Sequence, residues 1–135
     1  MRIAIEEAKK GDFPFGAVIV KDDKIIAKAH NTAAGVDPTA HAEVNAIRKA
    51  CKTLNTTNLS GCTLYTTSEP CPMCFFAAWW ARVSRIVYGA EVNDLTEDEW
   101  KIEIKSSYMN EHSDNRIEIR GGVMRKECLE LFNLH

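Results

Sequence analysis

The fold is decided by the stretch Cys62-Thr63-Leu64-Tyr65-Thr66-Thr67-Ser68-Glu69-Pro70-Cys71-Pro72-Met73-Cys74. Its first half, residues 62–67, is rich in Thr and apolar residues and lies between Gly61 and Pro70, which predicts a strand. The residues that follow, 72–82, are predominantly apolar and predict a buried helix that begins near Pro72. A strand that leads directly into a buried helix is typical of an α/β layered domain.

The rest of the chain continues this alternation. Before the central stretch, the patterns predict a helix over 2–10 that ends at Gly11, a hairpin of strands 15–20 and 25–27, and a helix from residue 40 to Leu54. After it, they predict a strand over 85–88, an acidic loop with some helix over 91–115, a strand over 116–120 and a helix over 123–132. Because no repeat or linker interrupts the chain, we expect one domain over 1–135 with a mixed sheet.

Composition limits the class of protein. The chain has 135 residues, of which 45% are hydrophobic and 27% charged, so it is too apolar to be disordered. No apolar run approaches the ~20 residues of a membrane span, and the early acids do not fit a signal peptide. We therefore expect a soluble, cytoplasmic protein with no membrane partner.

The charge distribution bears on partners. Residues 1–90 carry 11 basic and 8 acidic side chains, whereas residues 91–135 carry 6 basic and 11 acidic ones. Proteins that bind polyanions have a strong basic patch, which this chain lacks. Nucleic acid is therefore not the expected partner.

The five cysteines are Cys51, Cys62, Cys71, Cys74 and Cys128. An odd number without a secretory signal argues against a disulfide framework. Only the pair at 71 and 74 is closely spaced, which indicates a metal site or a redox pair. The other three lie on apolar faces and are predicted to be small buried hydrophobic residues.

A second motif, His41-Ala42-Glu43, adds a third candidate ligand to Cys71 and Cys74. One His and two Cys leave one position of a tetrahedral zinc ion open. Structural zinc sites fill all four positions with protein, whereas catalytic sites keep one for water. We expect one Zn²⁺ per chain in a catalytic site; a structural zinc is the alternative.

Both motifs lie where a helix is expected to begin, because Asp37-Pro38-Thr39 offers a cap and an early proline, as does Pro70-Cys71-Pro72. The positive ends of two helix dipoles would then face the metal and favour thiolates. Glu43 is adjacent and is not needed as a ligand. Because zinc lowers the pKa of bound water to ~7, Glu43 could accept that proton and pass it to a departing amine. These roles describe hydrolytic deamination.

These residues resemble the zinc-dependent cytidine/deoxycytidylate deaminase superfamily, whose signature is His-x-Glu with Pro-Cys-x-x-Cys. The resemblance runs from about residue 13 to 89 and more weakly to the end. It implies that His41, Cys71 and Cys74 are the zinc ligands and that Glu43 is the catalytic proton shuttle. It also implies a three-layer α/β/α sandwich with a five-stranded mixed sheet and a homodimer.

Within the superfamily, segments 14–22, 37–44 and 69–74 look most like bacterial guanine deaminases. Two features depart from that group: the loop from Asn31 to His41 is one residue shorter, and its Gly-Phe-Asp-Asp segment has no counterpart after Asp94. The ending, 117–129, looks more like the tRNA adenosine deaminase branch.

The resemblance also suggests substrate contacts. Asn31 matches the asparagine that contacts the base in both groups, and Ala42 and Trp80 are the other candidates. The leading hypothesis is zinc-dependent hydrolytic deamination of a free nucleobase or nucleoside by zinc-bound hydroxide, with guanine as the best single guess. The alternatives are a tRNA adenosine deaminase, a cytosine or cytidine deaminase, and a non-catalytic, zinc-stabilised binding module.

Overall fold

The structure, a computed structural model, describes residues 1–96 and 101–133. The strands are β1 (Gly16–Lys21), β2 (Lys24–His30), β3 (Thr63–Ser68), β4 (Arg85–Ala90) and β5 (Glu118–Arg120). The helices are α1 (Arg2–Ala8), α2 (Ala42–Leu54), α3 (Pro72–Trp80), α4 (Ser106–Glu111) and α5 (Arg125–Glu130), with short 3-10 helices η1 (Val92–Asp94) and η3 (Leu131–Asn133).

The strands form one five-stranded sheet in the order β2-β1-β3-β4-β5. β1 pairs antiparallel with both β2 and β3, whereas β3, β4 and β5 run parallel. The hairpin of β1 and β2 turns through Asp22 and Asp23, whose φ angles are 50° and 62°. Positive φ at both central residues is the geometry that a two-residue hairpin favours. The predicted mixed sheet is confirmed.

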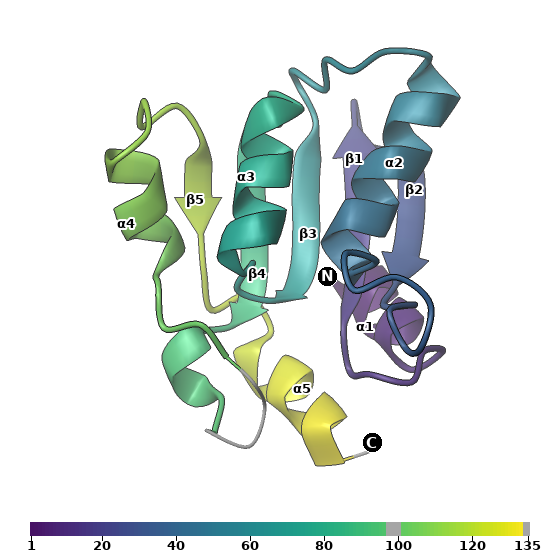
Figure 1. The fold of residues 1–135 in the computed structure, drawn as a ribbon, viewed down its shortest axis with the longest axis vertical. Coiled ribbons are helices and arrows are strands. Elements are labelled where there is room, and N and C mark those ends of the chain that lie inside the picture. Colours follow the sequence, from purple (N-terminus) through teal and green to yellow (C-terminus); the bar gives the residue numbers. More distant parts are fainter. Residues whose placement is uncertain (97–100, 134–135) are drawn as a thin grey trace.

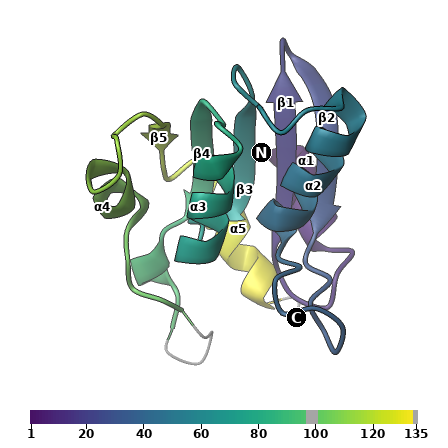
Figure 2. The same cartoon turned by 45° about the horizontal axis from the view of Figure 1, so that its top comes forward.

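Helices cover both faces of this sheet (Figures 1 and 2). α2 and α3 lie side by side on one face, and α4 packs against α3 near the β5 edge. α1 packs on β1 and β2, and α5 packs on β4, with their apolar residues in one cluster of the opposite face. The three-layer α/β/α arrangement is therefore as expected.

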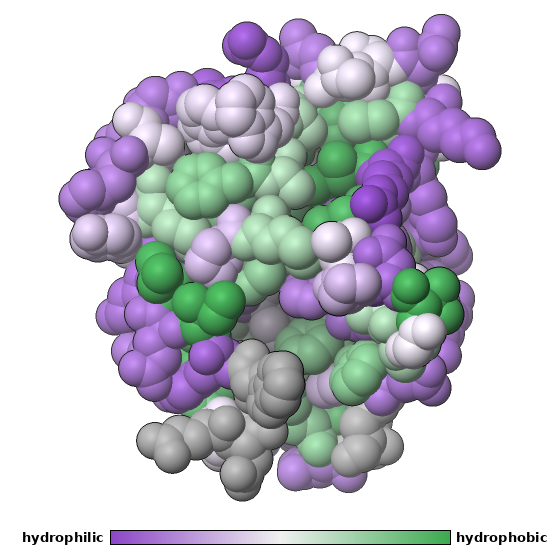
Figure 3. All heavy atoms as spheres, in the orientation of Figure 1, coloured by the Kyte–Doolittle hydropathy of each residue, from purple (hydrophilic) through white to green (hydrophobic). Residues whose placement is uncertain are grey.

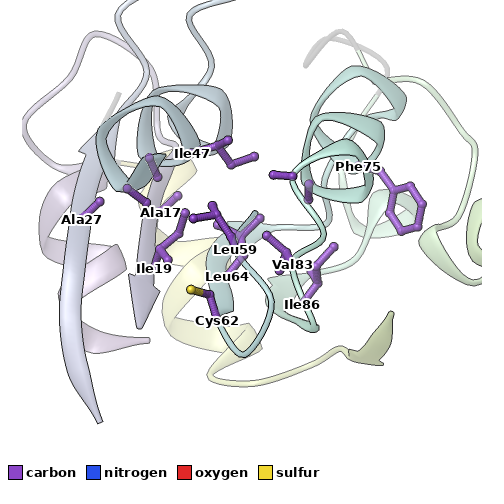
Figure 4. Packing of buried hydrophobic residues seen from close by; sticks show 14 of the residues in the cluster. Ala17, Ile19, Ala27, Ile47, Leu59, Cys62, Leu64, Phe75, Val83 and Ile86 are labelled. Carbon is purple, nitrogen blue, oxygen red and sulfur yellow. The ribbon is translucent and has the colours of Figure 1, made fainter. Parts of the chain in front are cut away.

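The main core lies between the sheet and the pair α2 and α3 (Figure 4). Ile19, Leu64 and Ile86 face it from the three central strands, and Phe75 enters it fully buried from α3. This packing fixes the starts of α2 and α3 relative to the ends of the strands. Among the described residues, the structure contains no helix long and apolar enough to cross a membrane.

Element boundaries agree with the sequence patterns to within a few residues. α3 ends at Trp80 instead of residue 82, and the final predicted helix divides into α5 and η3. The acidic stretch 91–115 contains η1 and α4, as expected of a loop with some helix, although residues 97–100 lie outside the described residues. Cys62 and Cys128 are buried and Cys51 is half-buried.

Close packing of α1 on β1 leads to a stability prediction for Gly16. A Cβ at this position would lie 2.6 Å from the Ala8 backbone nitrogen and even closer to the Ala4 carbonyl oxygen. Because backbone cannot move aside cheaply, we expect Gly16→Ala to lower the free energy of unfolding by about 3 kcal/mol. The control is Gly35→Ala, whose Cβ would meet nothing within 4 Å. Its positive φ costs only about 1–2 kcal/mol. Equal losses in urea titrations would contradict this account.

Candidate active site

Two helix starts meet at the carboxyl ends of the parallel strands β3 and β4, the edge of the sheet at which the antiparallel β1 begins (Figure 1). His41 is the N-cap residue of α2 and Cys71 is that of α3, both with extended backbone. Pro72 occupies the first turn of α3, where its missing N–H is not needed. The predicted cap at Asp37 is wrong: its carboxylate accepts hydrogen bonds from the backbone N–H and hydroxyl of Thr39, and α2 begins only at Ala42.

The structure brings the three predicted ligands together. The His41 Nδ1 lies 3.7 Å from the Cys71 Sγ and 3.5 Å from the Cys74 Sγ. With bonds of 2.0–2.3 Å, tetrahedral zinc places such atom pairs about 3.6 Å apart, so the donor set fits zinc in both chemistry and spacing. Among residues 1–96 and 101–133, no other such group of His, Cys, Asp and Glu could hold a metal ion.

The protonation of the site follows from its burial and its charges. A hydrogen bond from Cys74, reinforced by one from His41, lowers the pKa of the Cys71 thiol to about 4 despite burial. The hydrogen bond with Cys71, together with burial, raises the pKa of the Cys74 thiol. The hydrogen bond between His41 and Cys71 raises the pKa of the His41 imidazole. Burial and the negative charge of Cys71 raise the pKa of Glu43 to about 7. A carboxyl with such a pKa both accepts and donates protons near neutral pH.

A cleft of about 800 Å³ opens onto this group. In Figure 3, the face that carries α2 and α3 is hollowed below the amino-terminal end of α3. Its lining is largely apolar around a few polar groups, as is usual for small-molecule sites. The lining residues are Asp12, Phe13, Pro14, Phe15, Asn31, Ala33, His41, Glu43, Ser68, Glu69, Pro70, Cys71, Val92, Leu95, Lys101, Ile102 and Phe132.

The three predicted substrate contacts have different locations. Asn31 is nearly buried, lines the cleft, and its Oδ1 accepts the Ala33 backbone N–H at 2.8 Å. Ala42 is fully buried between His41 and Glu43, and it is not among the described residues that line the cleft. Trp80 is 75% exposed at the end of α3 opposite Cys71, and the structure does not bring it to the cleft.

Sequence reasoning missed the role of Glu69. Its Oε1 accepts the Val92 backbone N–H at 2.9 Å, and its Oε2 accepts that of Ser106 at 2.7 Å. The carboxylate therefore ties the starts of η1 and α4 to the segment that bears Cys71. Its position just before Pro70-Cys71 was the available signal, but the two partners are distant in sequence.

Phe132 was also missed as a cleft residue. It comes from η3, lines the cleft and packs edge-to-face on Phe15 with ring centroids 5.8 Å apart. The sequence marks it only as an apolar residue of the last helix. The carboxyl-terminal segment thus forms part of the cleft wall.

Asp94 does not line the cleft but links η1 to α5. Its carboxylate accepts the Glu91 backbone N–H at 2.8 Å and forms a two-contact ion pair with Arg125. Partial burial opposes ionisation, yet the bonds from Arg125 and Glu91 hold the pKa of Asp94 below its usual value. The link fixes α5 beside the part of the wall that Val92 and Leu95 form.

This link predicts a pH-dependent contribution to stability. A depressed carboxyl pKa stabilises the fold above the unfolded value of ~3.9, and the contribution is lost as pH falls through the folded value. We expect Asp94→Asn to lower the free energy of unfolding at pH 7 by about 1–2 kcal/mol. The gap to wild type should close below about pH 4. Exposed Asp23→Asn is the control, and a gap that stays constant with pH would contradict the assignment.

Comparison with known proteins identifies the class. Residues 1–90 match the family "Cytidine and deoxycytidylate deaminase zinc-binding region". The chain belongs to this family of zinc-dependent deaminases, and its His41, Cys71 and Cys74 could bind one zinc ion.

Two groups among the individual relatives bear on the substrate. Guanine deaminase of Bacillus subtilis (strain 168) is 58% identical over 85 residues, which cover 62% of this chain and 54% of that protein. The tRNA-specific adenosine deaminase of the same organism is 41% identical over 137 residues, 95% of this chain and 81% of that protein. The chain also matches 63% of the length of the tRNA-specific adenosine deaminase of Aquifex aeolicus.

Both of these groups are also found among the similar solved structures. A structure from a study of A-to-I editing by tRNA:A34 deaminases superposes with a TM-score of 0.82 at 32% identity, covering 97% of this chain and 96% of that one. The X-ray structure of guanine deaminase from Bacillus subtilis gives 0.70 at 49% identity, covering 74% and 68%. Both groups share the fold, so the fold alone does not select the substrate.

Proposed function

We propose that residues 1–135 form a single deaminase domain that hydrolytically removes the exocyclic amine of a free nucleobase or nucleoside, with guanine as the best single substrate. The observation that carries this proposal is the shared cleft of Glu43 and the metal-binding group. Glu43 is buried there with its pKa raised to about 7.

His41, Cys71 and Cys74 would hold the zinc, which when bound supplies the Lewis acidity that makes water a nucleophile at neutral pH. Glu43 accepts a proton from the attacking water and delivers it to the departing nitrogen. The water oxygen bonds to the ring carbon, the carbon–nitrogen bond breaks and ammonia leaves. Asn31 orients the ring, while Phe15 and Phe132 exclude bulk water.

The charges of the cleft support an uncharged substrate. Asp12, Glu43 and Glu69 line it, and Lys101 is the only Lys or Arg among its described lining residues. The Lys101 Nζ lies 3.1 Å from a Glu103 carboxylate oxygen and donates to the Leu95 carbonyl, so its charge is already partnered. A cleft with this balance favours a neutral heterocycle over a phosphorylated one.

Ammonia release from guanine, adenine, cytosine and their nucleosides tests the proposal, using the full chain loaded with zinc. The highest kcat/KM is expected for guanine. Turnover of a pyrimidine without turnover of guanine would overturn the substrate assignment, and zinc-loaded, folded protein that acts on none of these would overturn the small-molecule reaction.

Deamination of adenosine in tRNA is the second candidate. It is favoured by the Bacillus subtilis tRNA-specific relative, whose match covers 95% of this chain, whereas the guanine deaminase match covers 62%. Conversion of adenosine to inosine in an anticodon stem-loop, with a rate that falls steeply as salt rises, would establish this function.

We also propose that the protein is a homodimer through the outer face of α3. Trp80 is 75% exposed there, whereas the neighbouring Trp79 donates its indole N–H to Asp114 at 3.0 Å and stacks against Arg116. Large exposed aromatic residues are typical of interfaces. Light scattering of wild type and Trp80→Lys would test this, because a dimer through α3 should dissociate in the variant.

A further inference from the structure

Ser68 is the last residue of β3 and precedes Cys71 by three residues, with Glu69 and Pro70 between them. It is only 5% exposed, and its hydroxyl has no hydrogen-bond partner among residues 1–96 and 101–133. Yet Ser68 lines the cleft together with His41 and Glu43. Buried hydroxyls nearly always have a partner, so an unpartnered one on a residue that lines a binding cleft points to a ligand atom.

Most of the other polar side chains of the cleft are already engaged. Both carboxylate oxygens of Glu69 accept backbone N–H groups, and the Lys101 amine is held by a carbonyl and a carboxylate. Asp12 is exposed to solvent. His41, Cys71 and Glu43 belong to the metal group and the proton transfer. Among the described lining residues, the buried polar groups that remain for recognition are the Asn31 amide nitrogen and the Ser68 hydroxyl.

Asn31 has a defined orientation. Its Oδ1 accepts the Ala33 N–H at 2.8 Å, so it offers the Nδ2 N–H groups to the cleft. These groups can only donate, which suits a carbonyl oxygen or an unprotonated ring nitrogen. The hydroxyl of Ser68 can donate or accept, so the two side chains together can read two polar atoms of a planar heterocycle.

We propose that Ser68 is a specificity-determining residue whose hydroxyl forms a hydrogen bond with a polar ring atom of the heterocycle. The inference rests on the proposed function in that the heterocycle is the deaminase substrate. The substrate atom would then be the hydrogen-bond partner that the Ser68 hydroxyl lacks within the protein. A site built to form such a hydrogen bond rejects analogues that lack the ring atom, because the buried hydroxyl is then left unpaired.

The test compares Ser68→Ala with Ser106→Ala in the zinc-loaded full chain. Ser106 is the matched control: it is also buried, and its hydroxyl also has no partner among the described residues, but it does not line the cleft. Because neither alanine removes a protein hydrogen bond, both variants should melt at or above the wild-type temperature. A structural role for Ser68 would instead lower its melting temperature.

Binding should separate the two variants. We expect Ser68→Ala to lower kcat/KM for guanine about tenfold, mainly through KM, because one hydrogen bond to the substrate is lost. Ser106→Ala should leave kcat/KM unchanged. With deazaguanines that replace one ring nitrogen at a time by carbon, the loss caused by Ser68→Ala should vanish for the analogue that lacks the contacted atom.

Failure of this proposal is distinguishable from failure of the proposed function. Wild-type turnover with the same KM in Ser68→Ala would overturn the role of Ser68 and leave the deaminase assignment intact. If the wild type turns over no base, the proposed function is overturned, and Ser68 is then judged by calorimetric Kd values for guanine, adenine and cytosine. A tenfold weaker Kd in Ser68→Ala supports its role, whereas an unchanged Kd or no binding overturns it.

Discussion

Glu43→Gln is expected to lower kcat by about 10²–10⁴-fold, the usual contribution of a general acid–base, while the fold and the bound zinc are retained. Glutamine has nearly the same shape as the buried carboxyl but cannot carry a proton between water and the leaving nitrogen. Ammonia release gives the rate, elemental analysis gives zinc per chain, and thermal melting reports the fold.

The matched control is Glu111→Gln, which removes an exposed carboxylate at the end of α4. It should behave as the wild type in all three measurements. Retained turnover in Glu43→Gln would instead exclude Glu43 as the proton carrier. If wild type and variant bind zinc and neither has activity, the chain is a zinc-stabilised binding module.

Cys74→Ser is expected to weaken zinc binding by roughly 100-fold or more, since even changes outside the ligand shell cost 10–100-fold. Cys74 is fully buried and lies 3.5 Å from the His41 nitrogen, so no water or nearby group replaces its thiolate easily. The melting temperature should fall together with zinc content, because metal that binds only the folded chain stabilises it. Competition with a chelator measures the affinity.

Cys51→Ser is the control for this change. Cys51 is half-buried on α2, and burial raises the pKa of its thiol, so it behaves as an apolar side chain and not as a ligand. It should keep one zinc per chain with the wild-type affinity. Equal zinc affinity in the two variants would remove Cys74 from the ligand set.

Local patterns predicted the architecture and the chemistry well. Alternation of strands and helices indicated the mixed sheet, and two short motifs indicated a group that the structure brings together within 4.8 Å. This succeeded because His41 and Cys71 each occupy the N-cap position of a helix, although the expected cap of the first helix was Asp37. The sequence around each motif therefore placed it near a helix start, while the packing of α2 beside α3 brings the two starts together.

The walls of the cleft could not be predicted in the same way. Glu69 finds its partners at Val92 and Ser106, and Phe15 finds Phe132, through contacts between segments distant in sequence. Trp80 shows the converse. It is close to the Cys71 motif in sequence, yet it lies at the opposite end of α3. Such outcomes depend on the packing of whole elements, which no short pattern encodes.

The carboxylate of Glu69 has an evolutionary consequence. The family match ends at residue 90, yet Val92, Leu95, Lys101, Ile102 and Phe132 also line the cleft. The Glu69 carboxylate holds the later segment by accepting hydrogen bonds from backbone N–H groups. Every residue except proline has such a group. Side chains along that segment can therefore be substituted without loss of the hydrogen bonds to Glu69. A chimeric chain could keep the first 90 residues and take the remainder from a relative. Such an exchange would change the substrate and retain the reaction.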